Sequence, residues 1–161
     1  MLKLHLNQES TKMKNTIYLL AVAIIFTLAS CSKTTRYSKQ LTGEKWAISA
    51  FTVDGTPHEE LPHLEFADCD IYDESCTGEL VTHEGGVAHF IWQIRDQGDT
   101  FEYSDQTDHT HSDLDHHAIE ISAAISGVFS IEERSRKNMT LQSTALNGFK
   151  GKTVIIELTK E

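Results

Sequence analysis

The chain of 161 residues is poor in basic side chains, with 14 lysines and arginines against 24 acidic residues and a formal net charge of −10. An acidic surface repels phosphate backbones, so nucleic acid is excluded as an expected partner. The sequence also has no Walker-type phosphate loop and no Gly-x-Ser-x-Gly elbow, and it shows no nucleophile with a plausible base. We therefore expect a protein that is not an enzyme.

Long apolar runs are also scarce, and the one that stands out covers residues 17–28. Met13-Lys14 precedes it and Leu28-Ala29-Ser30-Cys31 closes it. A short basic start, an apolar middle and small residues before a cysteine are typical of a secretory signal. A transmembrane helix is the alternative, but it needs about 20 apolar residues, and Lys33 and Arg36 follow soon after this run.

The segment Leu28-Ala29-Ser30-Cys31 resembles the lipobox of bacterial lipoproteins. The resemblance implies cleavage before Cys31 and attachment of lipid, palmitate included, at that residue. We expect residues 1–30 to be the signal peptide, with Met13 as an alternative start, and residues 31–40 to be a lipidated tether. Ser32 favours sorting to the outer membrane of a Gram-negative envelope, with the periplasmic side favoured over the cell surface.

Processing would make the remaining chain more acidic. Three lysines and one glutamate lie in residues 1–30, which leaves 11 basic and 23 acidic residues and a formal net charge of −12. Such a surface repels anionic lipid, and the sequence indicates no basic amphipathic face. The expected attachment to the membrane therefore comes from the lipid anchor.

Cysteine is sparse as well, since only three are present. Lipid would occupy Cys31, which leaves Cys69 and Cys76 as an even pair in an exported protein, and such a pair favours a disulfide. The short ring would contribute about 2.5 kcal/mol in the chain-entropy treatment. A metal-binding thiolate pair is the alternative, although the spacing is not Cys-x-x-Cys.

From Leu41 onward the apolar residues recur with a period of two, the period of half-buried strands. Gly, Asn and Asp turns separate these segments, and no long helix is expected. We predict an all-β fold over residues 41–161, a small antiparallel up-and-down β-barrel of eight or nine strands. The expected strands are residues 45–53, 63–66, 79–83, 87–95, 100–104, 118–126, 128–133, 139–143 and 153–159.

The opening Leu41-Thr42-Gly43-Glu44-Lys45-Trp46 resembles that of lipocalin-like proteins, although Gly43 and Trp46 stand one residue farther apart than the family's Gly-x-Trp. The order of Phe66–Cys69, Cys76–Gly78, Phe90–Trp92 and the final segment 154–158 is similar to small bacterial lipocalin-like lipoproteins. The resemblance implies a closed barrel without catalytic residues, with room for an apolar molecule. Its candidate lining residues are Trp46, Phe90, Trp92, Tyr103 and Phe129.

The stretch from Asp105 to His117 holds four histidines and four carboxylates. Imidazole and carboxylate ligands suit zinc or copper, and the candidate ligands are His109, His111, His116 and His117. The alternative is a solvated acidic loop, because a His-rich tract is only a compositional signal.

These observations favour a non-catalytic envelope lipoprotein without a cofactor, which binds a small apolar ligand or a protein partner. A metal-binding lipoprotein that uses the 105–117 segment for zinc or copper is the first alternative. A structural accessory of an envelope complex is the second.

Overall fold

The computed structural model describes residues 32–59, 61–70, 75–107 and 113–161. The chain divides into two units, Met1–Lys33 and Thr34–Glu161, and the second contains all of the described strands. Cys31 and the predicted signal peptide lie outside the described residues. Among the helices that are described, none is both long enough and apolar enough to cross a bilayer.

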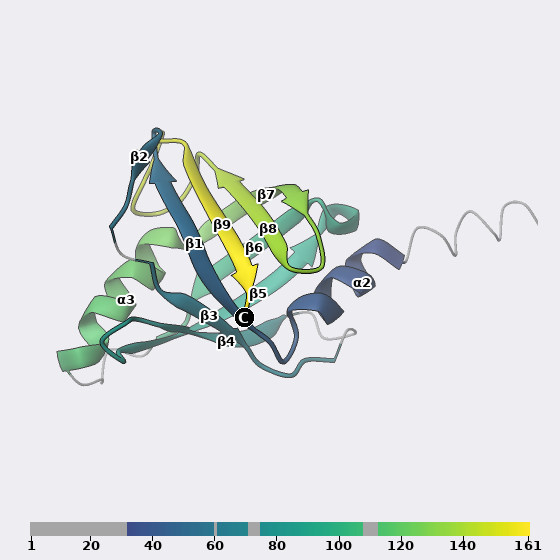
Figure 1. Ribbon diagram of the computed structural model, residues 1–161, viewed down its shortest axis with the longest axis horizontal. Helices are drawn as coiled ribbons and strands as arrows, with labels where there is room; N and C mark the ends of the chain where they lie inside the picture. The colour runs from purple at the N-terminus through teal and green to yellow at the C-terminus, as the bar shows by residue number, and fades with distance from the viewer. Residues whose placement is uncertain (1–31, 60, 71–74, 108–112) are drawn as a thin grey trace, which may run out of the picture. The chain divides into compact units, whose positions relative to one another are not determined.

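Nine antiparallel strands are found in the described part of the chain, and eight of them close into a barrel (Figure 1). They are β1 (Lys45–Val53), β2 (Thr56–Pro57), β3 (His63–Phe66), β4 (Cys76–Val81), β5 (Val87–Arg95), β6 (Thr100–Asp105), β7 (Gly127–Arg134), β8 (Asn138–Ser143) and β9 (Val154–Lys160).

The barrel closes because β9 pairs with β1 as well as with β8. The remaining neighbours follow the order β3-β4-β5-β6-β7-β8, and β1 pairs with β3 at the other side of this series. The short β2 is the extra strand, and it pairs with the end of β1 at Thr52 and Val53. The predicted all-β, antiparallel, up-and-down barrel is therefore confirmed.

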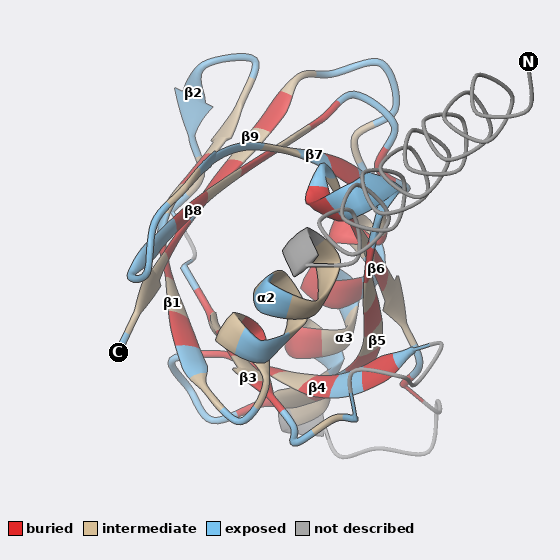
Figure 2. Cartoon of the chain, turned by 90° about the vertical axis from the view of Figure 1, so that its right-hand side faces the viewer, coloured by how far each residue is buried: buried red, intermediate tan, exposed pale blue. Residues whose placement is uncertain are grey.

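Side chains fill the interior of the barrel, and Figure 2 marks along the backbone the residues that are buried. In β5 every second residue from Ala88 to Ile94 is buried, as the alternating pattern of that strand predicts. The largest side chains that are almost wholly buried come from several strands, and they include two tryptophans and three phenylalanines. The Phe90 ring packs directly against the backbone of Gly78, where a Cβ would lie 2.4 Å from the Phe90 Cζ.

Residues 118–125, predicted as part of a strand, belong instead to helix α3 (Asp113–Ile125), so this strand prediction was wrong. The buried residues are Ala118, Ile121, Ser122 and Ile125. Their spacing of three, one and three residues is that of one helix face. A strand would place Ala123 on the same face as Ile121 and Ile125, whereas the structure leaves it exposed.

The segment predicted as a polar tether is helical from Ser32, where α2 (Ser32–Leu41) begins. Leu41 at its end is wholly buried, so the helix is fixed to the barrel at its last turn. Figure 2 looks along the barrel and shows α2 across the near end and α3 across the far end. We call the end where β1 begins the α2 end, and the end where β1 stops the α3 end.

Candidate functional site

Buried hydroxyl groups hold α3 in the far end of the barrel. The Tyr103 hydroxyl lies 2.8 Å from Ser122 Oγ, and Ser126 Oγ accepts a hydrogen bond of 2.8 Å from the Asp105 N–H. Near the start of the helix, Asp115 Oδ1 accepts a bond of 3.0 Å from the Val87 N–H. Burial raises the pKa of Tyr103 well above its ordinary value, despite the hydrogen bond to Ser122, so this hydroxyl is neutral at physiological pH.

The loop between β8 and β9 packs closely against the outer side of α3. The Gly148 N–H donates to the Ala124 carbonyl oxygen over 2.9 Å. A Cβ at Gly148 would lie 2.6 Å from the Ala124 Cβ and 2.9 Å from its Cα, which is closer than atoms can approach. Glycine is therefore required here, and it brings the neighbouring Phe149 alongside the helix.

Two cavities open beside α3, with volumes of about 350 and 200 Å³, and both are lined by His117 and Ile121. We call them together the α3 groove. Its apolar lining consists of Phe51, Leu61, Pro62, Ile121, Ala124, Ile125 and Phe149, and its polar lining of His58, Glu59, Thr82, His83, Glu84, His117 and Glu120.

Aromatic rings build one wall of this groove. The Phe51 ring stacks on His58 with centroids 4.6 Å apart, and it meets Phe149 edge-on at 5.7 Å. The His58 N–H of the main chain donates to the Phe51 carbonyl oxygen over 2.7 Å, which holds the two rings in register. His58 Nδ1 is buried without a hydrogen-bond partner, so one polar atom of this wall is left unsatisfied.

The five residues predicted to line a pocket occupy the packed interior, where each is at most 2% exposed; they are Trp46, Phe90, Trp92, Tyr103 and Phe129. Phe90 stacks on Tyr103 at 4.5 Å. Trp92 and Phe101 stack at 6.3 Å, and Phe101 meets Phe129 at 6.2 Å. These rings pack against one another and their neighbours. The α3 groove is lined by other residues.

Sequence reasoning missed the α3 groove because its lining comes from four separate segments. Ile121 belongs to residues 118–126, for which a strand was predicted. A useful signal was available in residues 118–125, where a helical spacing of apolar side chains follows a polar stretch. Leu61 gave no signal, since only the structure shows it to be 46% exposed beside the groove.

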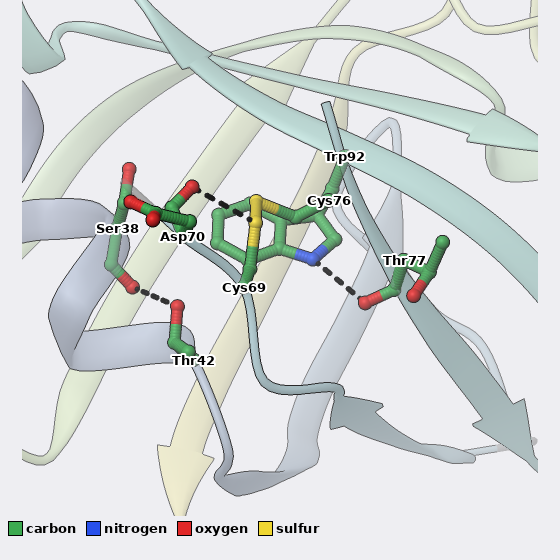
Figure 3. Close-up of a disulfide and its surroundings, with 7 residues drawn as sticks. All are labelled: Ser38, Thr42, Cys69, Asp70, Cys76, Thr77 and Trp92. Carbon is green, nitrogen blue, oxygen red and sulfur yellow. Dashed lines mark hydrogen bonds between the residues drawn. A yellow bond between two sulfur atoms is a disulfide. The ribbon is translucent and has the colours of Figure 1, made fainter. Parts of the chain in front are cut away.

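The predicted disulfide between Cys69 and Cys76 is present, with Cα atoms 5.6 Å apart (Figure 3). Cys76 is the cross-strand partner of Trp92 in the β4–β5 pair. The Trp92 indole N–H donates to the Thr77 carbonyl oxygen over 3.1 Å, so this part of the sheet is tied twice. The alternative of a thiolate pair for metal binding is excluded in this oxidised form.

The predicted metal ligands are only partly described. His109 and His111 lie outside the described residues. His116 and His117 are consecutive on α3, so their side chains point in different directions. Over residues 32–59, 61–70, 75–107 and 113–161, no three His, Cys, Asp or Glu side chains converge to hold a metal ion. Metal binding by the 105–117 segment stays a prediction.

The sequence was compared with protein-family models and with curated proteins. No family model matches it, and no curated protein matches it either.

Proposed function

We propose that this protein is a lipid-anchored, non-catalytic binding protein of the bacterial envelope, with a lipocalin-like barrel that takes a small apolar ligand. Support for the anchor comes from the lipobox-like Leu28-Ala29-Ser30-Cys31. The proposed location of the protein is the outer membrane, with the barrel on the periplasmic side. The closed antiparallel barrel is consistent with the calycin type of fold.

The observation that carries the ligand proposal is the α3 groove. Small-molecule sites are concave and mostly apolar, with a few polar groups, and their volumes start at about 300 Å³. The larger cavity of the groove has about 350 Å³, and the smaller one adds an apolar and aromatic lining. The barrel interior is filled by its own side chains, so the groove is the better candidate of the two places.

The polar lining indicates which apolar molecules would fit. Glu59 and Glu84 line the larger cavity and Glu120 lines the smaller one. Carboxylates repel an anionic head group, and their complement is a neutral or cationic one. The proposed ligand is therefore a small molecule with an apolar body and a neutral or cationic polar group.

Nile red, a neutral dye whose emission rises in apolar surroundings, is a suitable probe for a test. The chain from Ser32 to Glu161 can be used, because residues Thr34–Glu161 form one unit with the whole barrel and core. We expect saturable dye binding that dodecylamine reverses at lower concentration than dodecanoic acid does. The carboxylates of the groove would produce this difference.

Leu61→Ser and Val128→Ser form a matched pair for this test, since these two large apolar side chains are 46% and 50% exposed. Leu61 lines the groove, whereas Val128 belongs to β7 and lines neither of its cavities. Losing the contact with Leu61 should weaken dye binding about fivefold. Val128→Ser should leave it unchanged. Equal effects of the two substitutions, or no saturable binding, would refute the groove and favour a protein partner.

A further inference from the structure

A cleft at the α2 end gathers basic side chains on a protein that is acidic as a whole. It has a volume of about 530 Å³ and is lined by Arg36, Tyr37, Lys39, Gln40, Arg134, Ser135 and Arg136. Four of these described lining residues are basic and none is acidic. Two segments about 95 residues apart in the chain supply them, namely α2 and the turn between β7 and β8.

Arg134 joins the two sides of this basic cleft. Its guanidinium lies 3.1 Å from the centroid of the Tyr37 ring. Its Nε and Nη2 atoms donate to Gln40 Oε1 over 3.2 and 2.9 Å, and Gln40 Nε2 donates in turn to the Ser135 carbonyl oxygen. Arg134 Nη1 is buried and has no hydrogen-bond partner. The cleft is thus built around a cation that has no carboxylate partner among the described residues.

Three basic residues on the strands of the barrel pair with carboxylates. Lys45 pairs with Glu65, and Arg95 Nε lies 2.8 Å from Glu102 Oε2. Lys160 Nζ lies 2.6 Å from Glu44 Oε1.

By contrast, Arg36, Lys39, Arg134 and Arg136 form no ion pair with a described residue. Burial lowers the pKa of Arg134 to about 10, with the positive charge of Arg36 acting in the same direction. Arg134 is therefore still protonated at neutral pH. The basic cleft is a local concentration of uncompensated positive charge.

The basic cleft is close in the sequence to the proposed lipid anchor at Cys31. Arg36 is five residues after Cys31, so even a fully extended chain keeps it within about 18 Å of the anchored residue. At physiological ionic strength charges are screened over about 8 Å. The carboxylates of the α3 groove lie at the opposite end of the barrel, so they do not cancel the attraction of the basic cleft for a nearby anionic surface.

We infer that the α2 end of the barrel docks on the membrane, with the basic cleft against the phosphates of anionic phospholipids around the anchor. This inference rests on the proposed lipid anchor at Cys31. Arg36, Lys39 and Arg136 are exposed and reach the head groups, while Arg134 holds the two sides of the cleft together. Docking in this way turns the α3 groove away from the bilayer.

A chemically supplied anchor tests the docking separately from the natural lipidation. With Cys69 and Cys76 joined, Cys31 is the one free thiol of the 31–161 chain, and it can be coupled to a maleimide lipid. The coupled protein is placed on vesicles of phosphatidylcholine alone or with phosphatidylglycerol. Hydrogen exchange is then followed in residues 34–41 and 134–138.

We expect slower exchange in both segments on the anionic vesicles and not on the neutral ones. Each basic residue near an anionic surface contributes about a fivefold factor in binding, so Arg36→Gln, Lys39→Gln and Arg136→Gln together should weaken docking about 100-fold and abolish the protection. Lys150→Gln with Lys152→Gln is the control, because both lysines are exposed in the β8–β9 loop at the α3 end. This control should keep the protection.

Equal protection on neutral and anionic vesicles, or protection that survives the triple substitution, would overturn the inference. Absence of protection on the anionic vesicles would overturn it as well. The natural anchor is judged by a different measurement, mass spectrometry of Cys31 from envelope fractions. An unmodified thiol there would refute the proposed anchor and leave the result on vesicles as it stands.

Discussion

The two ends of this barrel are closed by helices that are held in different ways. At the α3 end the helix is part of the core, since Ala118 and Ser122 are wholly buried and Tyr103 bonds to the helix from inside the barrel. At the α2 end, Leu41 is the one wholly buried residue among the described side chains of α2. The outer side of this helix is held by contacts with Arg134.

This difference matches the two roles that we propose. The α3 end combines a packed helix with an apolar groove on its outer side, as a site for a small molecule requires. The α2 end combines a peripheral helix with a basic cleft, as contact with a charged surface requires. Substitutions that act on one end and spare the other can test this separation.

The largest effect is expected from the buried anchor of each helix. Ile125→Ala and Leu41→Ala remove side chains that are 2% and 0% exposed, and each should lower the free energy of unfolding by about 2–5 kcal/mol. Denaturant unfolding measures both. If the α3 end is the more integral one, Ile125→Ala reduces cooperativity of the whole barrel, while Leu41→Ala also releases α2 locally. Equal release of both helices in hydrogen exchange would contradict the comparison.

Removing the disulfide comes next in size. Cys69→Ala with Cys76→Ala should lower the free energy of unfolding by about 2.5 kcal/mol, because the open chain regains loop entropy in the unfolded state. The same loss should follow reduction of the wild-type protein. A shift of the thermal midpoint measures the effect, and dithiothreitol should not change the double variant. A double variant as stable as the oxidised protein would show that the disulfide does not stabilise the fold through the entropy of the unfolded chain.

Tyr103 gives the α3 end a dependence on alkaline pH. Burial raises its pKa in the folded protein, so the folded state binds the phenolic proton more tightly than the unfolded state does. The stability that this proton provides is complete below about pH 10, the unfolded value, and falls above it by up to about 1.4 kcal/mol per pH unit. Unfolding of wild type and Tyr103→Phe is compared from pH 7 to 11.

Tyr103→Phe removes this loss because it has no phenolic proton. At pH 7 it should be less stable by about 1 kcal/mol, since Ser122 loses its partner. The two stability curves should therefore approach each other above pH 10. Parallel curves throughout the range would rule out a buried, neutral Tyr103.

The smallest effect is expected at the α2 end. Arg134→Gln removes the contact with Tyr37 and the bonds to Gln40, which should cost about 0.5–1 kcal/mol. Hydrogen exchange should become faster in α2 and stay unchanged in α3. An increase in exchange at α3 would show that the two ends are coupled through the barrel.

The strands of the barrel could largely be predicted from the sequence. The bounds predicted for residues 45–53, 63–66 and 87–95 agree with β1, β3 and β5. In β3 and β5 every second residue is buried, whereas β1 departs from this alternation at the register shift between Ile48 and Ala50. Gly or Asp-Gly turns bound two of the three segments. Local pattern is sufficient where one face of a strand meets a single core.

The two helices and both clefts could not be predicted in the same way. In residues 118–126 isoleucines and alanines satisfy a period of two as well as a helical spacing, so the pattern left both a strand and a helix open. The basic cleft joins residues about 95 positions apart, which no local spacing reveals. The α3 groove likewise depends on how a loop approaches a helix at Gly148.

The seam between β1 and β9 has a consequence for biogenesis. The Ser49 hydroxyl donates to the Glu157 carbonyl oxygen across it, at a separation of 108 residues. The main-chain hydrogen bonds along this edge of β1 therefore form only when β9 is present. Contacts of such high sequence separation form slowly. For the export that we propose, this delay is an advantage, because no closed barrel can form before the final strand has been synthesised.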